Sequence, residues 1–161
     1  AQAYGEVVDV KWTGEFLPVA AARPHRGAAG RGGSIVLTSS LAGLRSLGAG
    51  NGYTESKHAI VGLMRSLAIE LAPHFIRVNS VHPTTVATPM ILNEHLFRQF
   101  RPDLECPTLE EAQEGLATLN LMAVPYVESV DITNAVLFLV GGTGRYITGV
   151  TLPIDAGAAL K

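Results

Sequence analysis

This sequence has little of several features that would point to particular classes of protein. Only 16% of its 161 residues are charged and the formal net charge is -2. This charge predicts no positively charged surface that would attract a nucleic acid or an anionic membrane. Its apolar runs fall short of the roughly 20 residues that cross a bilayer, which predicts no membrane partner. A single cysteine, Cys106, excludes an intrachain disulfide and favours a reducing cytoplasm.

Motifs for metal binding and for serine hydrolysis are also missing. No Gly-x-Ser-x-Gly elbow occurs. The five histidines lack metal-ligand spacing, so we predict no metal site and expect these side chains to fill caps and surfaces; they are His25, His58, His74, His82 and His95. The 47% hydrophobic content is that of one soluble domain with a core.

A tyrosine and a lysine four residues apart are the first chemical signal in the chain. Tyr53 and Lys57 follow a glycine-rich turn and open an apolar-periodic segment, which predicts a helix with both side chains on one face. A cation beside a phenol favours the phenolate, so such a tyrosine can serve as a general acid or base. Taken alone, the spacing favours the structural alternative, a partly buried tyrosine with a solvated lysine.

Apolar periodicity predicts an alternation of helices and strands. Pro18 interrupts the first helix, where we expect a bend or an early end. The predicted elements are a helix over 4–26, a glycine-rich connection over 27–33, a strand over 34–39, a helix over 51–72, a strand over 75–81, an irregular helical insertion over 89–125, a helix over 129–140 and a strand over 149–154.

Strand, long helix and strand in succession form a βαβ unit, which makes the two strands parallel. The fold class is therefore an α/β parallel sheet with helices on both faces. Ligands of such sheets bind beyond the carboxyl ends of the strands. Ser40 and the His82-Pro83 turn both follow such ends.

A serine at a strand end followed by Tyr-x-x-x-Lys resembles the active site of the short-chain dehydrogenase/reductase family. Further matches lie at 79–83 (Asn-Ser-Val-His-Pro), 88–90 (Thr-Pro-Met), 146–149 (Tyr-Ile-Thr-Gly) and 155–157 (Asp-Ala-Gly). By this resemblance the catalytic residues are Ser40, Tyr53 and Lys57, with Ser40 preferred to Ser39 for its distance from the tyrosine. The positions that would contact the cofactor are Tyr53, Lys57, Pro83, Val86 and Thr88.

The resemblance implies a Rossmann-type fold and an NAD(P)-dependent interconversion of a secondary alcohol and a ketone. NAD is the expected cofactor, with NADP not excluded, and the expected partner is a hydrophobic small-molecule alcohol or ketone. Family members associate through the helices that match 4–26 and 51–72, which predicts a homodimer or homotetramer. The insertion at 89–125 is read as a substrate lid, because Phe97 and Phe100 follow the cofactor-end turn.

Several stretches resemble one subgroup of the family, similar to carveol dehydrogenase and coupled to the redox peptide mycofactocin. They are His-Pro-Thr at 82–84, Thr-Pro-Met at 88–90, and the segments 100–105 and 145–153. Two positions depart from the family pattern. The turn after Pro83 carries Thr84 where the family usually has glycine, a change that the carveol-dehydrogenase-like subgroup shares. Lys11 stands where the family usually has an asparagine that supports a water relay, and a second cation there would repel Lys57.

The glycine-rich dinucleotide loop and the strands that precede it in a Rossmann domain have no match in the sequence. Residues 1–161 therefore read as the C-terminal part of a single short-chain dehydrogenase/reductase domain, a truncated copy of the enzyme. The alternative is a non-catalytic fragment or pseudoenzyme that keeps only its folding and association surfaces.

Overall fold

A parallel sheet of three strands organises the protein in the computed structural model, which describes residues 2–29, 32–46, 48 and 50–161. The strands are β1 (Gly33–Thr38), β2 (Ile76–Pro83) and β3 (Thr151–Ile154), in the order β1-β2-β3. β2 pairs in parallel with both neighbours, and the helix α3 (Tyr53–Leu71) joins β1 to β2. The predicted βαβ unit and fold class are confirmed.

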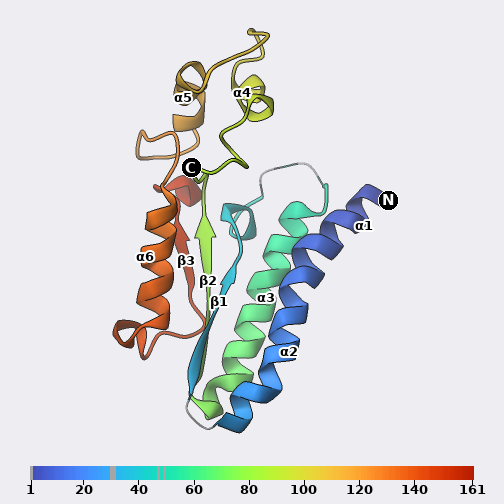
Figure 1. Cartoon of the computed structure of the whole chain (residues 1–161), viewed down its shortest axis with the longest axis vertical. Helices are drawn as coiled ribbons and strands as arrows, with labels where there is room; N and C mark the ends of the chain where they lie inside the picture. Colours follow the sequence, from blue (N-terminus) through green and yellow to red (C-terminus); the bar gives the residue numbers. More distant parts are fainter. Residues whose placement is uncertain (1, 30–31, 47, 49) are drawn as a thin grey trace.

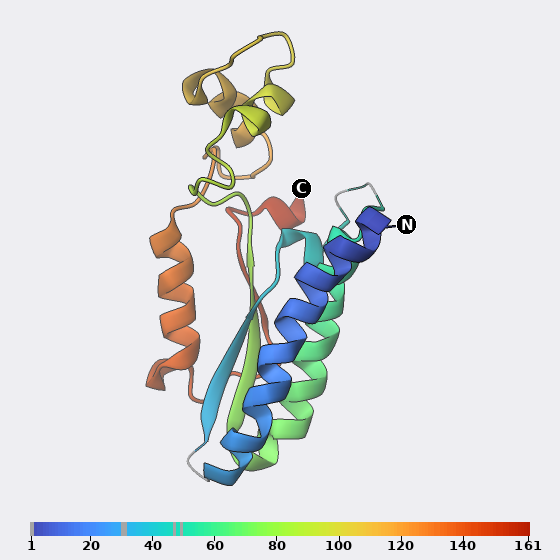
Figure 2. The same cartoon turned by 45° about the vertical axis from the view of Figure 1, so that its right-hand side comes forward.

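Helices cover both faces of this sheet (Figures 1 and 2). One face carries α3 together with α1 (Gln2–Val8), the π-helical turn η1 (Asp9–Thr13) and α2 (Gly14–Ala29), and the other carries α6 (Ser129–Val140). No helix of the described ranges is both long and apolar enough to cross a membrane.

The main core lies between α3 and the sheet. It contains Ile60, Met64 and Leu67 of α3, packed with Val78 of β2 and Leu37 of β1. Each is at most 5% exposed, and burying such a side chain contributes about 1.5–3 kcal/mol. Because this core fixes α3 against the strands, it also fixes the start of α3 relative to the strand ends.

The first helix differs from its prediction. It passes through Pro18 and ends at Ala29, so the early end is not found, and residues 27–29 are helical where the sequence predicts a connection. The irregularity lies upstream instead, in η1, where Gly14 donates its backbone N–H to Asp9. Pro18 is the fifth residue of α2, so its missing N–H leaves the Gly14 carbonyl without the usual i+4 donor, and the helix continues in spite of that loss.

The insertion forms a small unit beyond the carboxyl ends of the strands (Figures 1 and 2). Its helices are α4 (Glu94–Phe100), capped by Asn93, and α5 (Leu109–Ala117), which begins with a capping box of Thr108 and Glu111. A separate cluster joins them, made of Phe97, Ala112 and Leu116 with Leu96, Phe100 and Leu109 around it. The two phenylalanines expected to face substrate therefore pack inside the insertion.

Candidate active site

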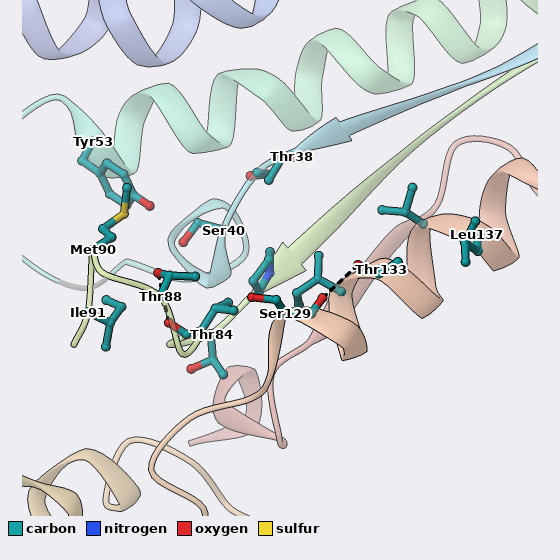
Figure 3. Close-up of a pocket in the computed structure, with 15 residues that line it drawn as sticks. Thr38, Ser40, Tyr53, Thr84, Thr88, Met90, Ile91, Ser129, Thr133 and Leu137 are labelled. Atoms are coloured by element: carbon teal, nitrogen blue, oxygen red, sulfur yellow. Dashed lines mark hydrogen bonds between the residues drawn. The ribbon is translucent and has the colours of Figure 1, made fainter. Parts of the chain in front are cut away.

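A cavity of about 570 Å³ opens where β1 and β2 end, at the edge of the sheet where the sequence predicts a ligand site. Its walls include Ser40, Tyr53, Pro83, Val86 and Thr88, which are all of the predicted site residues except Lys57. Figure 3 shows the Ser40 and Tyr53 side chains entering it from the end of β1 and the start of α3. Segments far apart in sequence thus meet at one site.

Tyr53 is the first residue of α3, and the turn before it sets its position. Gly52 adopts a φ of 87°, in the left-handed region that favours glycine. The Asn51 side chain then accepts a hydrogen bond from the Tyr53 backbone N–H at 3.1 Å. This turn directs the phenol to the cavity instead of along the outer face of α3.

Ser40 lies just past the end of β1, in extended backbone geometry. Its Oγ accepts a hydrogen bond from the Ala42 N–H at 3.1 Å and so caps the short 3-10 helix η2 (Leu41–Gly43). Ser39 also touches the cavity, but it is 4% exposed and its Oγ donates to the Lys57 carbonyl oxygen at 2.9 Å. Of the two serines, Ser40 is the one whose hydroxyl hydrogen is not already used within the described chain.

Gly43 allows η2 to lie directly against α3. A Cβ at this position would collide with the Ser39 hydroxyl and would come within 2.6 Å of the Lys57 carbonyl oxygen. A side chain here would therefore push the Ser40 turn away from the helix that carries Tyr53 and Lys57.

Lys57 lies behind the cavity, 8% exposed, with its Nζ 5.9 Å from the centre of the Tyr53 ring. The ammonium donates to the Thr38 carbonyl oxygen at 2.9 Å. Burial lowers the pKa of Lys57, the carboxylate of Glu15 opposes that shift, and the charge of Lys11 adds to it. The repulsion expected from Lys11 is thus present, and Glu15, which the sequence analysis did not single out, counters it.

The turn after β2 brings Pro83, Val86 and Thr88 to the cavity. An isolated parallel bridge between Val86 and Val127 anchors this turn to the segment before α6. The Thr88 hydroxyl donates to the Val86 carbonyl oxygen at 3.3 Å. These contacts fix the turn before any ligand binds.

Sequence reasoning missed part of this site. One wall of the cavity belongs to α6, which the sequence predicts as a helix but not as part of the site; its lining residues are Ser129, Ile132, Thr133, Val136 and Leu137. Thr38, Thr84, Met90 and Ile91 complete the lining. No group of three His, Cys, Asp or Glu side chains suited to a metal occurs within the described residues.

One histidine prediction is wrong. His58, His74 and His95 are exposed as expected, whereas His82 is fully buried at the end of β2. The side chain of His25 lies outside the described part of the chain. The central strand β2 is covered on both faces, so residues 78–82 are all buried and His82 is buried with them.

The fold and the cavity together define a class of protein, and comparison with known families agrees. Residues 1–159 match the family model described as Enoyl-(Acyl carrier protein) reductase, one of the models of the short-chain dehydrogenases/reductases. The chain belongs to the short-chain dehydrogenase/reductase family.

Within that family the chain is similar to carveol dehydrogenases. It is 54% identical over 156 residues to (-)-trans-carveol dehydrogenase of Rhodococcus erythropolis, covering 97% of this chain and 56% of the relative. The crystal structure of carveol dehydrogenase from Mycobacterium avium in complex with NAD matches with a TM-score of 0.95 and 47% identity, over 98% of this chain and 57% of that one. A short-chain dehydrogenase from Mycobacterium paratuberculosis bound to NAD matches with a TM-score of 0.82 and 34% identity, over 98% and 56%. The chain thus spans little more than half the length of these relatives.

Proposed function

We propose that this chain supplies the catalytic end of an NAD-dependent oxidoreductase that interconverts a hydrophobic secondary alcohol and its ketone. The observation that carries the proposal is one cavity lined by both Ser40 and Tyr53, with the Lys57 ammonium behind the phenol. A hydroxyl donor, a phenol and a cation gathered at one cavity suit proton transfer to or from an alcohol oxygen.

The chemistry divides between a proton and a hydride. In the oxidation, Tyr53 as phenolate takes the hydroxyl proton while the carbinol carbon loses a hydride, and both steps reverse when the ketone is reduced. Ser40 donates its O–H to the substrate oxygen and stabilises the charge that develops there. Lys57 places its positive charge beside the phenol ring. Bound NAD would supply the hydride acceptor.

The cavity suits the nicotinamide end of such a cofactor. Pro83, Val86 and Thr88 form a fixed wall beside Tyr53, and none of the lining side chains is charged. The uncharged wall suits a neutral ring and amide, and no lining residue distinguishes NAD from NADP. NAD is favoured because the Mycobacterium avium and Mycobacterium paratuberculosis structures contain it. Coupling to mycofactocin stays a prediction from the subgroup resemblance.

Apolar side chains favour a hydrophobic substrate. Met90 and Ile91 line the main cavity, and a neighbouring cavity of about 240 Å³ shares Ser40 and Tyr53 and adds Leu41 and Leu119. Met90, Ile91 and Leu119 all belong to the 89–125 segment. We therefore assign the lid role to these residues, because Phe97 and Phe100 are occupied in the core of the insertion.

The test is a chimera in which this chain replaces the matching segment of the Rhodococcus erythropolis carveol dehydrogenase. The chimera is assayed with NAD and a panel of hydrophobic secondary alcohols that includes (-)-trans-carveol. Turnover supports the proposal. A chimera that folds and binds NAD but turns over none of the panel would favour the non-catalytic alternative.

The Glu15 carboxylate should keep Lys57 charged, which predicts opposite effects of two substitutions. Because Glu15 raises the pKa of Lys57 and Lys11 lowers it, Glu15→Gln should lower that pKa further and Lys11→Asn should raise it. Nitrogen-15 NMR titration of the lysine Nζ measures both directly. In the chimera, the alkaline fall in activity should move to lower pH for Glu15→Gln and to higher pH for Lys11→Asn. Shifts of the same sign in both variants would contradict the proposed balance of charges.

We also propose that the chain self-associates through the outer face of α3. Gly62 is exposed there, and a Cβ added to it meets nothing within 4 Å. Gly62→Arg should therefore convert the oligomer to monomer in analytical ultracentrifugation, because the long side chain blocks close helix approach. The monomer should still fold, since arginine exceeds glycine in helix propensity by up to about 1 kcal/mol, but it should lose the stability that association adds to the wild type.

Gly142→Arg is the matched control for this interface. A Cβ added to Gly142 would likewise meet nothing within 4 Å, and this glycine lies in η4 (Gly142–Gly144), after the end of α6. Its substitution should leave the oligomer intact. A wild-type chain that stays monomeric at high micromolar concentration would contradict the interface.

A further inference from the structure

A buried chain of hydrogen bonds ends at the backbone of Ser40. His82 Nε2 lies 2.8 Å from the Ser80 Oγ, and His82 Nδ1 lies 2.8 Å from the Ser40 carbonyl oxygen. Ser80 and His82 are both 0% exposed, and neither lines the cavity. His82 therefore reaches the site through the Ser40 backbone alone.

The partners of His82 determine where its proton sits. A carbonyl oxygen can only accept, so Nδ1 must carry the hydrogen that it donates to Ser40. Burial lowers the pKa of His82, with the Ser40 carbonyl opposing that shift and the charges of Lys57 and His58 adding to it. In the neutral ring Nε2 is then unprotonated and accepts from the Ser80 hydroxyl, which fixes one tautomer.

The hydrogen bond from His82 to Ser40 lies just past the end of the backbone pairing between β1 and β2. The β1–β2 ladder ends with the bond from the Ser39 N–H to the Val81 carbonyl oxygen. In the parallel register the next donor would be the backbone N–H of residue 83, and Pro83 has none. Ser40 is consequently one residue past the last backbone bond between the strands.

Two donors hold the Ser40 carbonyl in place of the ladder. The Gly43 N–H donates to it at 2.9 Å from within the same turn, and His82 donates from the neighbouring strand. A carbonyl oxygen has two lone pairs, so this pair of bonds satisfies it fully. Of the two, only the His82 bond ties Ser40 to β2.

We propose that His82 is a positioning residue: its Nδ1–H holds the Ser40 backbone at the end of β2 and so sets the direction from which the Ser40 hydroxyl meets the substrate oxygen. The role in catalysis rests on the proposed function, because it acts through Ser40. The hydrogen-bond arrangement itself does not depend on that function and is tested separately.

The first experiment determines the tautomer in this chain. Long-range proton–nitrogen NMR correlations show which ring nitrogen of His82 is protonated, and we expect Nδ1. Ser80→Ala removes the donor to Nε2 but leaves the Ser40 carbonyl as the acceptor, so the ring should stay protonated at Nδ1. A wild-type ring protonated at Nε2 would overturn the proposal, because it could not donate to Ser40.

The second experiment compares two amide replacements in the chimera. Asparagine places its amide nitrogen as many bonds from Cα as Nδ1, whereas glutamine places its amide one atom further out. His82→Asn should therefore keep the bond to Ser40 and retain most of kcat. His82→Gln should lower kcat by about tenfold to a hundredfold, the cost of a small displacement at a reacting centre, with the KM for NAD within about twofold.

Controls separate positioning from a loss of fold. His74→Gln makes the same chemical change at an exposed histidine and should leave kcat unchanged. Rates are referred to the fraction of each variant that is folded, measured by circular dichroism. Equal kcat values for folded His82→Gln and wild type would overturn the proposal, as would equal losses for the asparagine and glutamine variants.

The positioning role of His82 can be tested even if the proposed function is wrong. If the wild-type chimera is folded but inactive, the carbonyl carbon-13 shift of Ser40 in this chain becomes the measure. It should move in His82→Gln and stay near its wild-type value in His82→Asn. An unmoved Ser40 carbonyl in the glutamine variant would reject the positioning role on its own.

Discussion

Replacing Tyr53 by phenylalanine should abolish turnover in the chimera while leaving the fold intact. The change removes one hydroxyl, which is the group that would exchange a proton with the substrate oxygen. General acid–base groups contribute about a hundredfold to ten-thousandfold, so kcat should fall by at least that much. The phenylalanine ring keeps the packing of the tyrosine at the start of α3, so the unfolding temperature should change little.

Tyr146→Phe is the matched control for this prediction. Tyr146 is 89% exposed and lies against Arg145, after the end of α6 and away from the cavity. The two variants undergo the same chemical change, and only the one at position 53 should lose activity. Substantial turnover by Tyr53→Phe would remove the tyrosine from the mechanism and with it the main basis of the proposed function.

The parts of the fold that the sequence predicted are those where local pattern and tertiary packing agree. The stripe of Ile60, Leu63, Leu67 and Leu71 recurs at helical spacing, and all four pack on the core side of α3, with Leu63 only partly buried. The apolar run before Ser40 forms β1, and the parallel pairing follows from the strand–helix–strand order. Since Tyr53 begins the helix between two such strands, its place at the carboxyl edge of the sheet was predictable from the same pattern.

The failures occur where a tertiary contact overrides a local preference. Pro18 lies within α2, which continues to Ala29 although local preference predicts a bend or an end there. Phe97 and Phe100 looked available for substrate, but α5 folds back and buries them. His82 looked like a surface residue because its partner is a backbone carbonyl 42 positions away. The sequence carries no local sign of such a bond.

The largest effect on binding should appear when this chain is compared with the chimera: alone, the chain should bind NAD about a thousandfold more weakly. Its cavity can hold the nicotinamide end, but no cationic side chain lines it to face a pyrophosphate. The N-terminus of α6 reaches the cavity at Ser129, yet the Asp131 carboxylate already accepts a hydrogen bond from the Glu128 N–H there, at 2.8 Å. Loss of about 4 kcal/mol of phosphate and adenosine contacts corresponds to that thousandfold change in Kd.

Isothermal titration calorimetry of NAD and NADP into both proteins measures this difference in Kd. Nicotinamide mononucleotide is the control ligand: because it has a single phosphate and no adenosine, its Kd should differ less between the chain and the chimera. Tight stoichiometric binding of NAD or NADP by the chain alone would show that these 161 residues hold far more of the cofactor site than the cavity walls indicate.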